Sequence, residues 1–123
     1  MILVDSSVWI GHLRAADGVL ADLLQRERVL VHPFVIGDVA LGLLRERDVV
    51  LPLLRALPAA VVAQDGEVAG LIERERLFGQ GIGYVDAHLL ASARLTVGAR
   101  LWTHDRRLGV VAERLGVGVG LLQ

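Results

Sequence analysis

Four aspartates lie beside apolar stretches of the sequence, where few neighbouring residues could stabilise their negative charge: Asp5, Asp38, Asp86 and Asp105. Each of them ends, opens or interrupts an apolar stretch, and Asp38 is the only charged residue between positions 34 and 44. A buried carboxylate costs free energy unless a cation or hydrogen-bond donors compensate its charge. Because the chain has no lysine, four such acids indicate a hard metal ion as their common partner.

Carboxylates that gather around Mg²⁺ or Mn²⁺ are suited to hydrolysing phosphodiesters. The ions neutralise a phosphate, orient a water molecule and lower its pKa, and they can stabilise the leaving oxygen. Mg²⁺ keeps several waters and takes few protein oxygens, so carboxylates on separate elements suffice. The aspartates therefore predict a metal-dependent hydrolase that acts on phosphodiester bonds.

Each acid also has a purely structural interpretation. Asp5, Asp86 and Asp105 fit helix N-caps or first-turn acids, which stabilise a helix by about 1 kcal/mol. Asp38 does not fit, because it comes several residues after Pro33, a natural first-turn residue, and has apolar neighbours. For any one acid the two interpretations are about equally good, but the cap interpretation leaves Asp38 unexplained.

The elements that must position these acids alternate between short β-like runs and longer helical patterns. Strands are predicted at 1–5, 29–32, 59–63, 99–103 and 117–121. Helices are predicted at 7–14, 18–27, 34–46, 48–57, 66–78, 84–97 and 106–115. This alternation predicts an α/β fold with a parallel, helix-covered sheet in a single domain over 1–123. Ligands of such sheets bind beyond the carboxyl ends of the strands, where all four acids are expected.

The composition narrows the class of protein. At 123 residues the chain can bury a core, and it has no cysteine, which excludes disulfides and thiolate metal sites. No apolar run is long enough to span a membrane, and no basic segment precedes the first apolar run, so we expect a cytoplasmic protein. An apolar fraction of 54% favours an interface with a partner or a second copy. The net charge of −1 means that any polyanion must be held locally, by arginines or through metal ions.

Four motifs in order, at 5–10, 33–42, 81–93 and 101–108, closely resemble those of PIN-domain ribonucleases of the VapC toxin type. The resemblance runs nearly end to end. It implies a PIN-like three-layer fold, with a five-stranded parallel sheet in the order 3-2-1-4-5 flanked by helices. It also implies a Mg²⁺- or Mn²⁺-dependent endoribonuclease, a homodimer, and neutralisation by a VapB-type antitoxin whose C-terminal segment covers the active site.

The resemblance also assigns roles to residues. It implies that the metal-binding acids are Asp5, Asp38, Asp86 and Asp105, and that the hydroxyl of Thr103 hydrogen-bonds these acids, as Ser7 also does near Asp5. The family usually has Glu at position 38, so the carboxylate of Asp38 reaches one methylene less far. It also often has Thr at Ser6 and Arg at His104.

Several further residues are candidates for contacts. Arg106 and Arg107, next to Asp105, are the best candidates for binding RNA, whereas Arg45 and Arg47 are expected on a solvated helix face. His32 and His88 are expected to be structural, and His104 to lie at the rim of the site. A groove for an antitoxin helix, or alternatively part of the core, is predicted from Trp9, Leu13, Leu20, Leu23 and Leu24.

Two classes of alternative remain open. One is a PIN-like RNA-binding or interaction module with weak or no catalysis, crippled by the shorter Asp38. The other is a receiver-like phosphotransfer module, which needs a lysine that this chain lacks. A phosphatase of the Asp-x-Asp type is disfavoured, because Ser7 stands where its second aspartate is needed.

Overall fold

The sheet at the centre of the molecule is parallel, as its sequence pattern predicts. In a computed structural model that describes residues 1–120, β1 (Ile2–Val4) lies between β2 (Val29–Leu30) and β3 (Arg100–Trp102). Ile2 is in register with Val29 on one side and with Arg100 on the other. The N-terminal strand is therefore the middle strand, and its carboxyl end opens directly onto Asp5.

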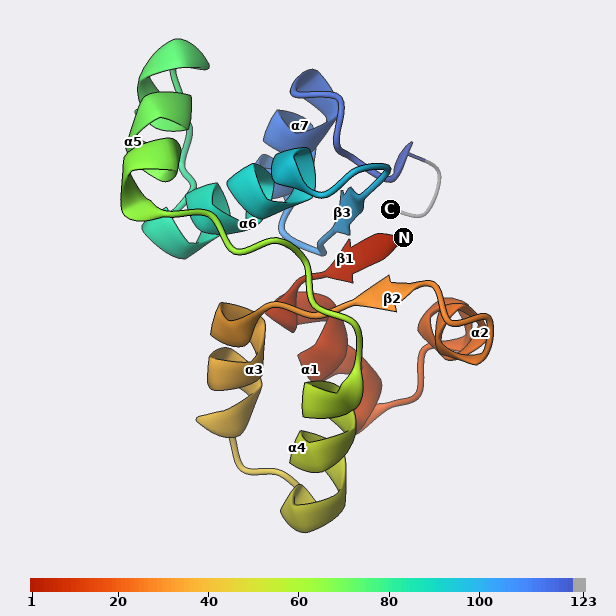
Figure 1. Cartoon of the computed structure of the whole chain (residues 1–123). Helices are drawn as coiled ribbons and strands as arrows, with labels where there is room; N and C mark the ends of the chain where they lie inside the picture. The colour runs from red at the N-terminus through yellow and green to blue at the C-terminus, as the bar shows by residue number, and fades with distance from the viewer. Residues whose placement is uncertain (121–123) are drawn as a thin grey trace.

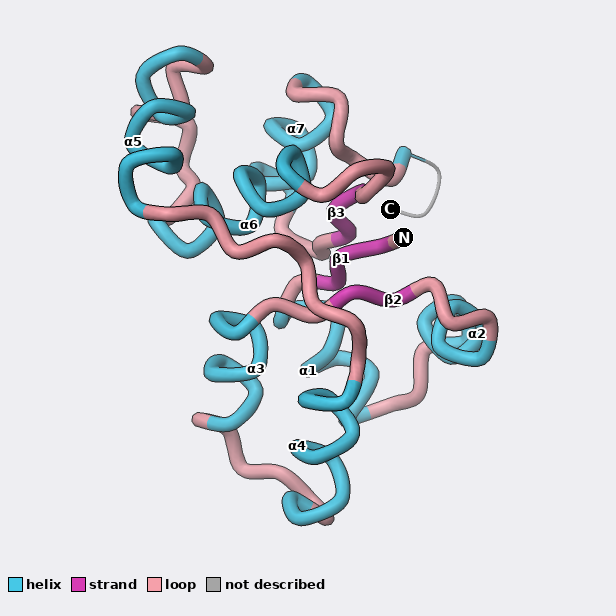
Figure 2. The backbone as a smooth tube through the Cα atoms, in the orientation of Figure 1, coloured by secondary structure: helices cyan, strands magenta, loops and turns pink. Residues whose placement is uncertain are grey.

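Seven helices accompany these strands in the described part of the chain. They are α1 (Ser6–Arg14), α2 (Gly18–Gln25), α3 (Pro33–Ala40), α4 (Arg47–Ala56), α5 (Asp65–Arg74), α6 (Tyr84–Leu95) and α7 (Arg106–Arg114). Helices α1, α3 and α4 form one group and α5, α6 and α7 another, with the strands between the two groups (Figure 1). The loop that joins α4 to α5 crosses from the first group to the second (Figure 2). None of the helices described is long and apolar enough to cross a membrane.

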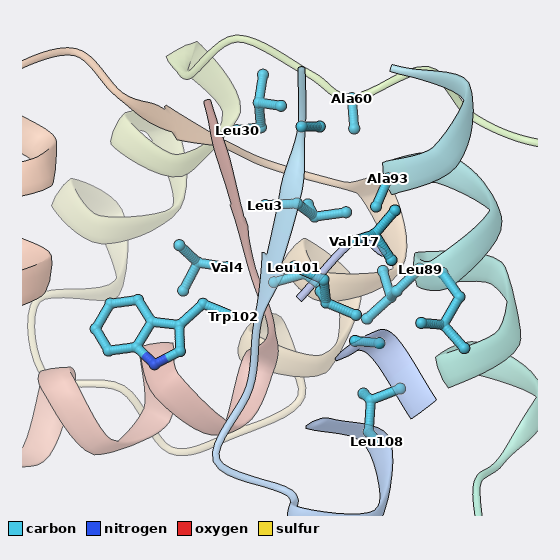
Figure 3. Packing of buried hydrophobic residues seen from close by; sticks show 14 of the residues in the cluster. Leu3, Val4, Leu30, Ala60, Leu89, Ala93, Leu101, Trp102, Leu108 and Val117 are labelled. Carbon is cyan, nitrogen blue, oxygen red and sulfur yellow. The ribbon is translucent and has the colours of Figure 1, made fainter. Parts of the chain in front are cut away.

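Side chains from both faces of the sheet enter the core. Along β3, Leu101 and Trp102 point to opposite sides, as successive residues of a strand must, and Leu3 and Val4 do the same along β1 (Figure 3). All four are at most 2% exposed. A short sheet buried on both faces needs continuous apolar strands, which explains the runs Ile-Leu-Val and Leu-Trp in the sequence.

Of the five expected strands, three form the sheet in the described residues, and the segments 59–63 and 117–121 extend it only by isolated bridges. Each of these segments contributes one parallel bridge, Ala59 to Val31 and Gly118 to Leu101. In the first segment the Ala60 N–H donates to the carbonyl oxygen of Val31, and the next N–H, that of Val61, donates to the Thr96 hydroxyl. In the second, Gly120 turns away with φ +63°, and position 121 lies outside the described residues.

The helix predicted at 34–46 is also shorter in the structure, because α3 ends at Ala40. Beyond it the chain turns, and Glu46 adopts a left-handed conformation with φ 51° just before α4 begins. Leu41 and Leu43 have no core to enter and are 89% and 107% exposed. The apolar sequence thus continues to Leu44, beyond the end of α3 at Ala40, and so predicts too long a helix.

The buried position of Leu101 gives a test of this core. Leu101→Ala should lower the free energy of unfolding by about 2–5 kcal/mol, because it leaves a cavity in the middle of the sheet. The matched control is Val97→Ala, at a side chain 99% exposed, which should change stability by no more than about 0.5 kcal/mol. Urea denaturation followed by circular dichroism measures both, and equal losses in the two variants would contradict this assignment of the core.

Candidate active site at the carboxyl ends of the strands

Asp5 is the most strongly held of the four acids. It is the N-cap of α1 and is only 7% exposed. One carboxylate oxygen, Oδ1, accepts the Ser6 N–H at 2.8 Å. The other, Oδ2, accepts hydroxyl hydrogens from Ser7 at 2.8 Å and from Thr103 at 2.7 Å. Hydrogen bonds to the ionised form compensate much of the cost of burying this charge without a basic partner.

The two hydroxyls also tie the loop after β3 to the loop after β1. Thr103 Oγ1 accepts the backbone N–H of Asp105 at 3.0 Å, and Ser7 Oγ accepts that of His104 at 3.0 Å. Each hydroxyl therefore donates to Asp5 and accepts from the loop that carries Asp105. Both side chains make the hydrogen bond to an acid that the family resemblance implies. Thr103 is 3% exposed.

Asp86 and Asp105 combine a cap with a free oxygen. Asp86 lies in the first turn of α6, where its Oδ2 accepts the Gly83 N–H at 2.9 Å. Asp105 is the N-cap of α7, and its Oδ1 accepts the Leu108 N–H at 3.1 Å. Within residues 1–120 the second oxygen of each carboxylate accepts no hydrogen bond from the protein. Both side chains thus satisfy a backbone N–H at the start of a helix, and each has an oxygen left to bind a ligand.

The sequence suggested that Asp38 has apolar side chains around it, and this is wrong. Asp38 is exposed, whereas its neighbour Val39 is fully buried. The apolar residues beside it in sequence are distributed around α3, so the carboxylate is on the solvent side. Its Oδ2 accepts a hydrogen bond of 3.0 Å from the hydroxyl of Ser6, which also lies 3.3 Å from Asp5 Oδ1. Sequence reasoning missed Ser6 as a link between two acids; its position directly after Asp5 was the only signal.

Electrostatics place all four acids in one neighbourhood. The pKa of the Asp86 carboxyl is raised, first by partial burial and then by the negative charges of Asp5, Asp105 and Asp38, while the Gly83 N–H opposes the shift. Such mutual repulsion is felt only by charges that lie close together. None of the ion pairs among residues 1–120 involves these acids. The cluster is therefore an uncompensated negative site.

The donor set fits a hard divalent cation that keeps part of its water. Carboxylate oxygens are the ligands that Mg²⁺ and Mn²⁺ prefer, and the repulsion that raises the pKa of Asp86 is what a cation would relieve. Among residues 1–120, no three acidic or histidine side chains lie close enough to surround one ion directly. Mg²⁺ is commonly bound by one or two carboxylates and several waters, which this arrangement allows.

The histidines lie around the site and not within it. His32 is the N-cap of α3, and its Nδ1 accepts the Phe34 N–H at 3.0 Å. Burial, together with the nearby His88, lowers the pKa of His32 from 6.5 to about 4. His88 is 2% exposed, with its ring 4.9 Å from that of Phe34. His32 and His88 are structural, as predicted, and His104 is exposed beside Asp105.

Basic side chains border the site at the start of α7. Arg106 and Arg107 are exposed and have no ion-pair partner among residues 1–120. With Gln80 they line a cavity of about 300 Å³. Two arginines beside Asp105 can offer a polyanion positive charge that the molecule as a whole lacks.

Comparison with known proteins agrees with the motifs. The chain belongs to the PIN domain family, whose model matches residues 2–114. It is 51% identical over 119 residues to Ribonuclease VapC32 of Mycobacterium tuberculosis strain CDC 1551 / Oshkosh, covering 97% of this chain and 96% of the relative. Ribonuclease VapC32 of strain H37Rv matches with the same identity and coverage. The predicted resemblance to PIN-domain ribonucleases of the VapC type is confirmed.

The hydroxyl of Thr103 provides a test of the network around Asp5. Thr103→Val keeps the shape but removes the hydroxyl, so Asp5 Oδ2 loses a donor and the Asp105 N–H loses its acceptor. We expect the free energy of unfolding to fall by about 1–3 kcal/mol. Thr103→Ser keeps the hydroxyl and should lose clearly less. Thermal denaturation in EDTA measures both, and equal stability of Thr103→Val and wild type would contradict the network.

The lowered pKa of His32 predicts a pH dependence of stability. Because the unfolded chain binds a proton near pH 6.5 and the folded one only near 4, this histidine favours folding above pH 6.5 and progressively loses that contribution as the pH falls to about 4. His32→Asn keeps an acceptor for the Phe34 N–H but does not titrate. Its free energy of unfolding should fall less steeply than that of wild type between these pH values, as urea denaturation at several pH values measures. Parallel curves would contradict the assignment.

Proposed function

We propose that this protein is a metal-dependent endoribonuclease that acts as the toxin of a toxin–antitoxin pair. The observation that carries the proposal is the convergence of Asp5, Asp38, Asp86 and Asp105 at the carboxyl ends of the parallel strands, without a basic partner. The 51% identity to proteins named Ribonuclease VapC32 supports the same activity.

The four aspartates are the residues that would hold Mg²⁺ or Mn²⁺. When bound, such an ion neutralises the scissile phosphate and lowers the pKa of an attacking water. Asp5 is fixed by the Ser6 N–H and by the hydroxyls of Ser7 and Thr103, so its carboxylate keeps one orientation. The charge of Asp105 acts on Asp86, and each carboxylate has one oxygen without a hydrogen bond from the described residues, so these oxygens could bind the ion or accept a hydrogen bond from a water. Thr103 and Ser7 act through Asp5 and position it.

An RNA strand is a suitable substrate for a site of this shape. Asp38 and Asp105 are exposed, so a phosphate in the middle of a polymer can reach them. Arg106 and Arg107 lie next in the chain to Asp105 and supply local positive charge for neighbouring phosphates. Endonucleolytic cleavage is the proposed mode, because internal phosphates of a polymer can reach exposed carboxylates.

An antitoxin of the VapB type is the proposed protein partner. Helices α1 and α4 border an apolar cavity of about 300 Å³ lined by Trp9, His12, Leu13, Leu24, Val50, Leu53, Leu54 and Leu57. Of the groove residues predicted from sequence, Trp9, Leu13 and Leu24 line it, whereas Leu20 is fully buried in the core. Leu53 is 64% exposed and would be covered by an amphipathic helix.

A homodimer in the cytoplasm completes the proposal. Large apolar side chains remain exposed on the described surface, among them Leu43, Val97 and Phe78. A second copy or a partner that covers such side chains would remove their apolar surface from water. The absence of cysteine suits a reducing compartment.

A binding module with a weak active site is the second candidate. Two observations favour it: Asp38 is short and exposed, and no three acids among residues 1–120 are near enough to surround one ion. Calorimetric titration with Mn²⁺ separates the two. Binding that is lost in Asp86→Asn supports the nuclease, and no carboxylate-dependent binding supports the module.

Cleavage assays test the catalytic role of Asp86. Asp86→Asn keeps an oxygen for the Gly83 N–H but removes the charge, so it should lower cleavage of a random single-stranded RNA pool in Mn²⁺ by about a hundredfold or more. The matched control, Asp48→Asn in the first turn of α4, should cleave like wild type. Excess EDTA should abolish cleavage by wild type. Full activity of Asp86→Asn, or activity that survives EDTA, would refute the mechanism.

A further inference from the structure

Asp38 is held differently from the other three acids. Asp5, Asp86 and Asp105 each accept a backbone N–H of their own helix terminus, so local structure fixes their carboxylates. Asp38 lies in the second turn of α3, where backbone N–H groups are already used within the helix. Among residues 1–120 its one hydrogen-bond partner is the Ser6 hydroxyl, at 3.0 Å from Oδ2. Without that contact, an exposed aspartate is free to change rotamer.

The other end of this contact is fixed. Ser6 is the first residue of α1, and its backbone N–H donates to Asp5 Oδ1 at 2.8 Å. Its hydroxyl has one hydrogen and two acceptors within reach, Asp38 Oδ2 at 3.0 Å and Asp5 Oδ1 at 3.3 Å. Asp5 Oδ1 already accepts a hydrogen bond from the Ser6 N–H, whereas Asp38 has no other donor among the described residues. The Ser6 hydroxyl therefore contributes most through its shorter contact, the one to Asp38.

Ser6 also lies between two charges that repel each other. Helices α1 and α3 pack together, and the negative charges of both Asp5 and Asp38 act on Asp86. Repulsion drives an exposed carboxylate outward unless a donor holds it. A hydroxyl between Asp5 and Asp38 offsets part of that repulsion and leaves Asp38 Oδ1 without a hydrogen bond from the described residues.

We propose that Ser6 is a positioning residue that tethers Asp38 to Asp5, so that the short carboxylate of Asp38 faces the metal site. This inference rests on the proposed metal-dependent function. Ser6 acts through Asp38 and does not itself bind the ion or the substrate. The tether brings a side chain on the solvent side of α3 into the group formed by the three helix-terminus acids.

The test measures the Kd of Mn²⁺ by calorimetry for wild type, Ser6→Ala and Ser6→Thr. Ser6→Ala should bind Mn²⁺ about fivefold more weakly, the scale of losing one hydrogen bond. Ser6→Thr keeps the hydroxyl and should bind like wild type. Thermal denaturation in EDTA checks that both variants are folded. An unchanged Kd in Ser6→Ala, or a loss in Ser6→Thr as large as in Ser6→Ala, would overturn the proposal.

A double-mutant cycle shows which acid Ser6 acts through. In an Asp38→Ala background, Ser6→Ala should cause no further loss of Mn²⁺ affinity, because the residue that it positions is gone. An equal loss in both backgrounds would mean that Ser6 acts through Asp5, and the tether would be refuted. If wild type itself binds no Mn²⁺, the proposed metal-dependent function fails first and this inference falls with it. If wild type binds and Ser6→Ala binds equally well, only the inference fails.

Discussion

The buried carboxylate of Asp5 is the constraint on which this end of the molecule depends. It is 7% exposed and has no basic partner among the described residues, so its charge must be stabilised by donors alone. Two of those donors, Ser7 and Thr103, also hold the backbone of the loop that follows β3. The requirement of one charge thus fixes two loops from distant parts of the chain. The other acids are placed relative to that fixed point.

The clustering of the four acids is unfavourable for the stability of this part of the fold. Asp86 has a raised carboxyl pKa because it is partly buried and faces three other negative charges. A protein selected for stability alone would separate these charges or pair them with arginine. Exposed arginines are present nearby, at positions 106 and 107, but they form no ion pairs with the cluster. Among the described residues no basic side chain pairs with these acids, which is the observation behind the proposed cation site.

Sequence reasoning predicted the parallel sheet and the meeting of the acids because both follow from topology. Strands that alternate with helices direct their carboxyl ends to one edge, and Asp5 and Asp105 come directly after such ends. Sequence reasoning failed where contacts between residues distant in the sequence determine the structure. Apolar neighbours in sequence suggested that Asp38 is buried, yet a helix turns them to other sides. The segment 59–63 was predicted to be a strand, but it pairs with the sheet only through an isolated bridge at Ala59. The Ser6 contact joins positions 32 residues apart, which no local pattern reveals.

The central position of β1 has a consequence for synthesis on the ribosome. Its residues are made before those of both neighbouring strands, and one of these neighbours, β3, begins only at Arg100. The hydrogen bond from Thr103 to Asp5 spans 98 positions, so a nascent chain lacks it until Thr103 has emerged. Pairings this distant in sequence also slow folding. A nascent chain that has not reached Thr103 therefore carries Asp5 with the Ser7 hydroxyl but without that of Thr103, and translation must pass Asp105 before the assembled cluster can exist.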